Sequence, residues 1–376
     1  MPLGNGDAGA NIWVEPSGDV LFYISKVDAH DSSHTIRKLG RIRLRFEPSL
    51  DVERFRQTLV LSDATVEIQA GGAKLRIWID AHRQVIRMEG SSTSPVIPTI
   101  SFETLRNCIE LDDAAHRLSW GYRNESSVWI ENVPAQNSAG FAARVHDPLL
   151  HRTSGCRVSG PGFVRSGKRS LQRAPGLSFE FDVRVLSAQT ESAEDWFALL
   201  EKPVAVDWKA HRQYWHEFWN RSWIRVNGCG SSSVQLDQCR FTQYAQGSLA
   251  YAGHQEFAAP ENAFQITQRY ALERFCQAAA GRGSVPPPYN GSIFSMDMPA
   301  GTQGFLGPME KPVSADERDW GVLAFMWQNT RHPYWSMAAR GDYDCLLAGM
   351  RFVRQGLDIC RDRCANLFHH GGAYIM

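Results

Sequence analysis

The sequence predicts a large antiparallel β-sandwich over residues 1–205, followed by a mainly helical region. Two observations lead to this fold class. In the first half of the chain, short runs alternate polar and apolar residues with a period of two, and Gly, Pro, Ser and Asn separate these runs. From about residue 235 onward, apolar residues instead recur with the spacing of one helix face.

The alternation of polar and apolar residues predicts the positions of individual strands. Three apolar side chains share one face of residues 74–80, and Gly71-Gly72 separates this run from the one at 64–70, so a hairpin is expected. The same alternation is present at residues 41–46 and 179–185, and a turn at Gly18-Asp19 precedes the run at 20–23.

The helices are predicted from the spacing of apolar residues and from residues that are typical of helix ends. In residues 207–219, Trp208, Trp215 and Trp219 form one stripe, which we expect to pack between two domains. The next helix is expected from an N-cap at Asn262 to the glycines that begin at Gly281. Further helices are expected at 318–332, where Pro333 would end the helix, and at 342–364.

Composition excludes several classes of function. The chain has 376 residues, enough for two domains, and 40 basic residues balance 40 acidic ones. With no net charge and no polybasic run, we expect no nucleic acid or membrane as a partner. The eight cysteines form no CxxC pair and no Cys/His ligand spacing, so we predict no metal site and no cofactor. The oligomeric state stays open.

The most informative segment lies near the C-terminus. Amide, guanidinium, imidazole and indole groups gather there, and proteins use such groups to hold sugars, because hydroxyls need two-way hydrogen-bond partners and pyranose C–H faces stack on aromatic rings. The segment contains Trp320, Gln328, Asn329, Arg331, His332 and Trp335.

Three ordered blocks resemble glycoside hydrolase family 95, the α-L-fucosidase and α-L-galactosidase family, and more closely a bacterial branch of family-95-like proteins. The first block is residues 1–10, similar to the family's P-[IL]-G-N-G-x-x-G-A. The second runs from Arg269-Tyr270 to residues 287–291. The third is the segment at 320–335, and His369-His370 resembles a later H-H of the family.

The resemblance implies a fold and a mechanism. The fold would be an N-terminal β-super-sandwich at 1–205, a helical linker at 206–245 and the first part of an (α/α)₆ six-hairpin toroid at 246–376. The mechanism would be inverting hydrolysis of a glycan, in which one carboxylic acid protonates the leaving oxygen and a base activates water. Asn329 would position that water or a sugar hydroxyl.

The sequence departs from the family pattern at several positions. Trp327 replaces the first asparagine of N-x-N, Asn290 replaces a glutamine, and Gly371-Gly372-Ala373 replaces N-T-D, so fucose specificity does not transfer. The general acid and base would lie beyond Met376. We therefore expect the chain to be a fragment, short at both ends and inactive alone. The family is secreted or periplasmic, but no signal peptide is visible in this chain.

Each candidate residue also has a structural interpretation. Asn329 is a catalytic candidate or a buried amide, and Arg331 binds an acidic sugar or forms a salt bridge. Asp297 contacts substrate or makes a turn. The further substrate-binding candidates are Asn290, Trp320, Gln328, Trp335, His369 and His370.

A glycoside hydrolase is the favoured function. Two alternatives remain: a glycoside phosphorylase with a basic phosphate pocket in place of the base, and a carbohydrate-binding protein without catalysis. The departure at Trp327 favours the second alternative.

Overall fold

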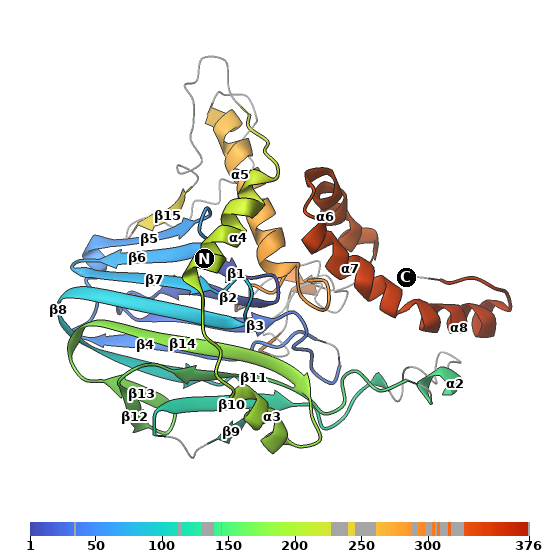
Figure 1. The fold of residues 1–376 in the computed structure, drawn as a ribbon, viewed down its shortest axis with the longest axis horizontal. Helices are drawn as coiled ribbons and strands as arrows, with labels where there is room; N and C mark the ends of the chain where they lie inside the picture. The colour runs from blue at the N-terminus through green and yellow to red at the C-terminus, as the bar shows by residue number, and fades with distance from the viewer. Residues whose placement is uncertain are drawn as a thin grey trace.

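A computed structural model shows a broad antiparallel sheet with helices packed along one edge and beyond it (Figure 1). The described residues are 1–33, 35–111, 115–129, 132, 139–143, 145–226, 240–244, 261–287, 292–297, 303–304, 307–308, 315–316 and 327–374. Fifteen strands belong to the large sheet, and β16 (Gln303–Gly304) pairs separately with β17 (Gly307–Pro308). The predicted combination of an antiparallel sheet and several helices is confirmed.

The strands of the large sheet are short except for β8 and β14. They are β1 (Pro2–Gly4), β2 (Ala8–Val14), β3 (Val20–Lys26), β4 (Arg41–Glu47), β5 (Phe55–Val60), β6 (Thr65–Ala70), β7 (Ala73–Ile79), β8 (Val85–Glu103), β9 (Ile109–Leu111), β10 (Arg117–Arg123), β11 (Arg152–Ser159), β12 (Phe163–Gly167), β13 (Ser170–Arg173), β14 (Gly176–Gln189) and β15 (Arg240–Tyr244).

Strand β8 joins two parts of the sheet. Its first half pairs with β7 and β14, and its second half pairs with β4 and β13. Apolar side chains from both parts, such as Ile77 of β7 and Leu44 of β4, belong to one buried core cluster. A strand that pairs on both sides along its whole length therefore connects the two parts through a common core.

The alternation predicted from the sequence is present in most strands. In β7, Leu75, Ile77 and Ile79 are buried on one face, and β6 and β7 form the expected hairpin across Gly71-Gly72. Strand β3 differs, because all its residues are buried. The segment at 292–297 covers its second face, where the Ser25 hydroxyl donates to the Ile293 carbonyl.

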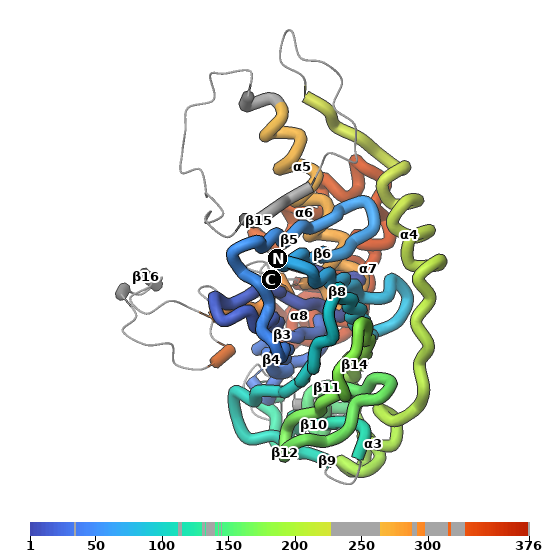
Figure 2. Tube along the Cα trace, turned by 90° about the vertical axis from the view of Figure 1, so that its left-hand side faces the viewer, coloured from blue at the N-terminus to red at the C-terminus, as the bar shows by residue number. Residues whose placement is uncertain are grey.

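Most helices follow the main run of strands, whereas η1 and α2 lie between strands. They are η1 (Val52–Arg54), α2 (Ala139–Ala142), α3 (Ala193–Leu200), α4 (Trp208–Asn220), α5 (Glu261–Ala280), α6 (Trp327–Arg340), α7 (Tyr343–Gln355) and α8 (Leu357–Phe368). The chain from α3 through α4 runs along one side of the sheet (Figure 2). None of the helices in the described part of the chain is long and apolar enough to cross a membrane.

Helix α4 packs its tryptophan stripe between the sheet and α5, as expected. The Trp215 ring lies 5.3 Å from that of Phe275 in α5, and Trp219 Nε1 donates to the Leu61 carbonyl at 2.7 Å. Trp208 contacts Trp78 of β7, with the ring centroids 5.0 Å apart. The stripe therefore fixes α5 to the sheet.

Three local predictions were wrong. Helix α6 continues through Pro333 to Arg340, because Tyr334 and Met337 beyond the proline are buried and their packing outweighs one lost backbone hydrogen bond. The helix expected at 342–364 is divided at Gly356 into α7 and α8. The sequence of residues 223–226, Trp-Ile-Arg-Val, predicts a short strand, but these residues form none. Helix α5 ends before Gly281 as predicted.

Candidate functional site

The N-terminal turn and the end of α5 are joined by backbone hydrogen bonds. The Gly6 N–H donates to the Ala279 carbonyl and the Arg282 N–H donates to the Gly6 carbonyl, both at 2.8 Å. A Cβ at Gly4 would lie 2.0 Å from the Ala279 oxygen, so only glycine permits this approach. The first and second sequence blocks are therefore in direct contact.

Asn5 holds this turn in place. Its side-chain oxygen accepts from the backbone N–H groups of Asp7 and Ala8, at 3.1 and 2.9 Å. Its amide nitrogen donates to the carbonyls of Asp80 and Arg83, both at 2.8 Å. With its side-chain donors and acceptor all used within the protein, Asn5 has a structural role at the junction of β1, β7 and α5.

The segment at 292–297 lies between the sheet and a cavity. Ile293 and Ser295 are buried against the sheet, where Asn11 Nδ2 donates to the Ser295 carbonyl at 3.0 Å. Ser292 and Phe294 line the cavity on the other side. This alternation is that of an extended chain, whose successive side chains point in opposite directions.

The cavity has a volume of about 350 Å³ and lies between α5 and α6. Thr330, Pro333, Tyr334 and Met337 of α6 form one wall at helical spacing. The other lining residues, from α5 and the segment after it, are Glu273, Cys276, Gln277, Pro287, Ser292 and Phe294. The cavity thus combines aromatic and aliphatic surface with a few polar groups, the usual composition of a small-molecule site.

Thr330 offers an unused hydrogen-bonding group to this cavity. The residue is 7% exposed, and its hydroxyl has no hydrogen-bond partner among the described residues. An unpaired buried hydroxyl is costly, on the order of 1–3 kcal/mol. A ligand hydroxyl in the cavity would supply the missing partner.

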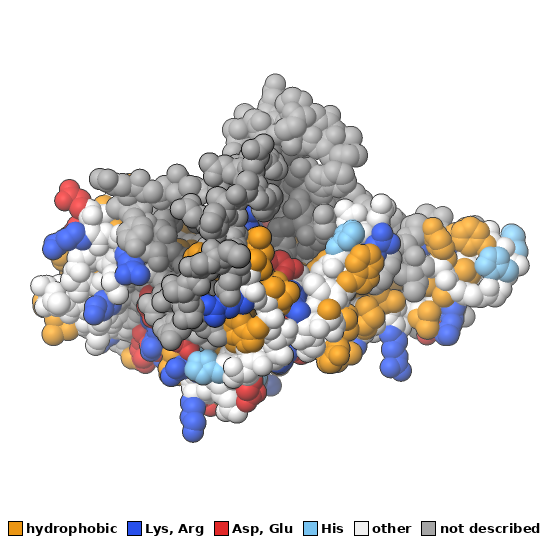
Figure 3. Space-filling view, turned by 90° about the horizontal axis from the view of Figure 1, so that it is seen from above, with side chains coloured by type: hydrophobic (Ala, Val, Ile, Leu, Met, Phe, Trp, Pro, Cys, Tyr) orange, Lys and Arg blue, Asp and Glu red, His pale blue; other side chains and the backbone are white. Residues whose placement is uncertain are grey.

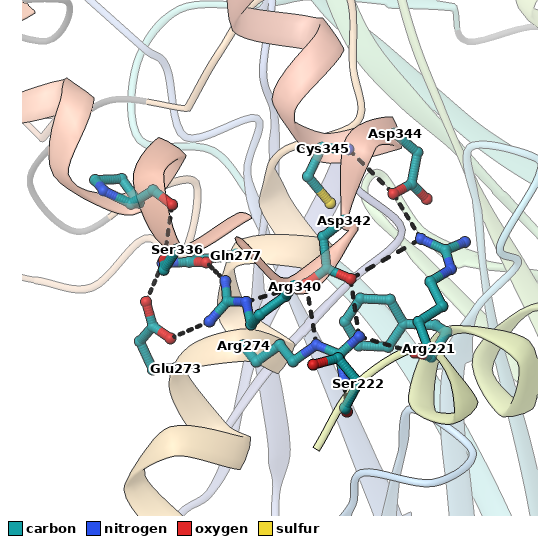
Figure 4. A network of polar contacts seen from close by, with 12 residues as sticks. Arg221, Ser222, Glu273, Arg274, Gln277, Ser336, Arg340, Asp342, Asp344 and Cys345 are labelled. Carbon is teal, nitrogen blue, oxygen red and sulfur yellow. Dashed lines mark hydrogen bonds and ion pairs between the residues drawn. The ribbon is translucent and has the colours of Figure 1, made fainter. Parts of the chain in front are cut away.

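A network of charges behind the cavity orients its polar edge (Figure 4). Arg340 donates to Glu273 at 3.0 Å and also to the Gln277 side-chain oxygen, while Gln277 donates to Glu273. Arg340 also lies 3.2 Å from Asp342. The carboxylate and the amide at the cavity are therefore held in fixed positions.

The centre of the network is fully buried. Arg274 and Asp342 are 0% and 2% exposed and form a two-pronged pair, with nitrogen–oxygen distances of 3.0 and 2.8 Å. The remaining guanidinium donors bind the carbonyls of Ser222 and Phe218. Every charge in this pair has a partner, which keeps the cost of burying it low.

A second pair extends the network toward α4. Arg221 donates to Asp344 at 2.8 Å, and the Tyr214 hydroxyl donates to the same carboxylate at 2.9 Å. Burial alone would raise the pKa of Asp344, but the hydrogen bond and charge of Arg221 outweigh it and lower the pKa. This carboxylate is therefore an ion-pair partner and not a proton donor.

Two titratable groups that face the cavity are neutral at ordinary pH. Burial raises the pKa of the Cys276 thiol to about 12, and burial with a smaller effect of Cys345 raises that of Tyr334 to about 12. A thiol attacks as its thiolate, so Cys276 has no nucleophilic role in this environment. Glu273 is the carboxylate among the described lining residues.

Helix α6 turns none of its candidate residues toward the cavity, and the residues of the third sequence block that do line it were not among the candidates. Thr330 and Tyr334 of the third sequence block point into the cavity. Arg331 and Trp335 lie together away from it, and Trp335 is 62% exposed. The exposed Gln328 and the half-buried Asn329 are also not among the described residues that line the cavity.

The other candidates lie elsewhere. Asp297 is on the outer surface of the sheet, where it accepts from the Tyr23 hydroxyl at 2.7 Å and from Lys38 at 3.0 Å. His369 and His370 are exposed after α8, and His370 donates to the Gly371 carbonyl. The structure does not place these residues at the α5–α6 cavity. Asn290 and Trp320 lie outside the described residues.

Sequence reasoning missed Glu273, Gln277, Phe294 and Met337. Glu273 and Gln277 are four residues apart on a helix that was predicted, a spacing that puts both on one face. That spacing was the available signal. In the described part of the chain, no group of three or more His, Cys, Asp or Glu side chains is arranged to hold a metal ion.

Comparisons with known proteins match the chain to a family model and to several solved structures. The model of the N-terminal part of a domain of unknown function, DUF5703, matches residues 1–110 and 107–224. A bacterial glucoamylase complexed with acarbose is similar with a TM-score of 0.38 and 8% sequence identity, over 98% of this chain and 54% of the glucoamylase. The chain thus spans about half the length of that enzyme. A comparison with curated proteins gives no match.

Proposed function

The chain belongs to the DUF5703 family, whose function is unknown, and we propose that it binds a glycan in the α5–α6 cavity, as a protein of the six-hairpin glycosidase type. One observation carries this proposal. The second and third sequence blocks that resemble glycoside hydrolase family 95 line one cavity, although they are far apart in the sequence, and the first block contacts the end of the second.

The contacts between the blocks support a shared role. The first block binds the end of α5 through Gly6 and Arg282, and α5 supplies Glu273 and Gln277 to the cavity. The third block supplies Thr330 and Tyr334. If the resemblance were due to chance, there would be no reason for separate blocks to line the same cavity.

The lining of the cavity fits the chemistry of a sugar. The Tyr334 and Phe294 rings offer faces on which the C–H side of a pyranose can stack. The carboxylate of Glu273 can accept hydrogen bonds from ring hydroxyls, and the amide of Gln277 can donate to them or accept from them. The Thr330 hydroxyl, which has no partner among the described residues, can serve the same purpose. The volume is near the lower end for ligand pockets, so a single sugar unit is the expected occupant.

Cleavage needs more than the described cavity provides. Inverting hydrolysis uses two carboxyl groups about 6.5–9.5 Å apart, one as acid and one as base. Glu273 is the carboxylate among the described lining residues, and Arg340 and Gln277 already hold it. We therefore propose that these residues bind the glycan, and that the 376-residue chain alone does not cleave it.

The finer assignments are part of the same proposal. They are a β-super-sandwich at 1–205, a linker at 206–245 and the start of a six-hairpin toroid from residue 246, with an acid and a base outside the cavity described above. Strand β15, which lies in the proposed linker, pairs with β5 of the sheet. A carbohydrate-binding protein without catalysis is the second candidate, because the described lining residues include one carboxylate, Glu273, and Arg340 already binds it.

A glycan array probed with the purified chain tests the proposal. We expect binding to a restricted set of glycans, and at least about a tenfold loss for Gln277→Leu. Gln213→Leu is the matched control, because Gln213 donates to Glu217 four residues along the exposed face of α4. Equal binding by parent and Gln277→Leu would overturn the proposed site. Turnover of aryl glycosides by the chain would contradict the proposed absence of cleavage.

A further inference from the structure

The outer face of α6 carries an exposed indole with a cation beside it. Trp335 is 62% exposed, and the guanidinium carbon of Arg331 lies 5.5 Å from the centre of its ring. The His332 ring is 5.5 Å from the Trp335 ring and nearly perpendicular to it, at 79°. Seen from above, hydrophobic side chains are at the surface beside basic and His side chains in the part formed by α6 to α8 (Figure 3).

Arg331 has no anionic partner in the described part of the chain. Its Nε is buried and makes no hydrogen bond there, whereas Arg340 of the same helix contacts Glu273 and Asp342. Helix α6 itself contains no Asp or Glu. A guanidinium without a carboxylate, beside an exposed aromatic ring, is a group that can bind an external anion.

We propose that Arg331, His332 and Trp335 form a second sugar-binding site, which is specific for an acidic sugar. The Trp335 ring would stack on the C–H face of a pyranose. The guanidinium of Arg331 would bind the carboxylate of a uronate or a sulfate group with two parallel hydrogen bonds, and the imidazole of His332 would contact the edge of the ring.

The observations favour an acidic sugar over a neutral one. A neutral sugar requires several uncharged donors and acceptors around its hydroxyls, as in the α5–α6 cavity. On the outer face the polar groups next to the aromatic ring of Trp335 are a cation and an imidazole, with the exposed amide of Gln328 one turn before them. This site does not depend on the cavity, because Arg331 and Trp335 lie on a different face of α6 from Thr330 and Tyr334.

Calorimetric titration of the 376-residue chain tests the second site. The probes are tetragalacturonate, a sulfated galactose tetrasaccharide and neutral galactotetraose. We expect at least one acidic probe to bind tenfold or more tightly than the neutral one. Binding of the uronate alone or of the sulfate alone would identify the anion. Equal affinity for acidic and neutral probes would overturn the proposal.

Variants test the second site. Arg331→Gln should reduce the affinity for the acidic probe about tenfold or more. Arg331→Lys should reduce it less, because lysine keeps the positive charge but cannot form two parallel hydrogen bonds with the anion. Trp335→Ala should reduce it as well. Arg351→Gln on the exposed face of α7 is the control and should leave it unchanged.

Two results would contradict a sugar-binding role for the outer face of α6. If Arg331→Gln keeps full affinity for the acidic probe, the guanidinium has no part in binding and the proposal fails. If Trp335→Ala changes the sedimentation coefficient of the chain and no probe binds, the face is a contact between copies of this protein.

Discussion

The Arg282 backbone N–H donates a 2.8 Å hydrogen bond to the Gly6 carbonyl, although Arg282 lies just after α5 and Gly6 lies in the turn between β1 and β2. Gly6 has a φ of +91°, a left-handed conformation that lets its carbonyl face α5. This contact joins the sheet to the helices that form the cavity.

Substitution Gly6→Ala should destabilise the protein by more than about 2 kcal/mol, because of backbone strain and overpacking. The added Cβ would lie 2.3 Å from the Arg282 Cβ. Urea unfolding measures the loss. The control is Gly371→Ala, where no atom lies within 4 Å of the new Cβ. Similar stability for both variants would contradict the proposed role of this junction.

Removing one partner of the buried Arg274–Asp342 pair should cost about 3–5 kcal/mol. In Arg274→Met the carboxylate stays buried, at 2% exposure, without its two-pronged partner. The matched variant is Arg361→Met, because Arg361 and Asp358 are 60% and 82% exposed and such pairs contribute little. Thermal unfolding of both variants gives the comparison. A small effect of Arg274→Met would mean that Arg340 and Arg221 suffice for Asp342.

The stability of the protein should fall as pH decreases from about 6.5 to about 4 because of His211. Burial lowers the pKa of His211 to about 4, and the residue is 0% exposed. The unfolded chain, with a pKa near 6.5, therefore binds the proton first, and the contribution is complete above that pH. Its full size is on the order of 3 kcal/mol.

His211→Gln isolates this contribution. Glutamine can still donate to the Asp63 carbonyl, which the His211 Nε2 contacts at 2.8 Å, but it cannot be protonated. Urea unfolding at several pH values should show a flatter pH dependence for the variant than for the parent. Parallel curves would show that the buried imidazole does not control acid stability.

Thr330→Val should separate binding from stability. Replacing an unpaired buried hydroxyl by a methyl group should leave stability unchanged or slightly higher, while glycan affinity at the cavity falls severalfold. The opposite is expected for Thr267→Val, because the Thr267 hydroxyl accepts from the Val226 N–H at 2.9 Å and that bond stabilises the fold. Loss of stability in Thr330→Val without loss of binding would refute a ligand role for this hydroxyl.

The cavity could be predicted only in part from the sequence. The third sequence block lies in the helix that lines the cavity, but spacing along one helix does not reveal which face is turned inward. Packing of Tyr334 against Gly349 of α7 decides the rotation of α6 and turns Trp335 outward. Glu273 and Gln277 reach the cavity because Arg274 and Asp342 fix α5 against α7, and no local pattern encodes that contact.

The sequence by itself determined the alternation of the strands, the hairpin at Gly71-Gly72, the end of α5 and the balance of charge, because these depend on neighbours within a few residues or on composition. The tertiary structure alone decided that α6 passes through Pro333, that β3 is covered on both faces and that the N-terminal turn meets Arg282. Those features depend on packing between segments far apart in the chain, and that packing outweighs local preference wherever it buries enough surface.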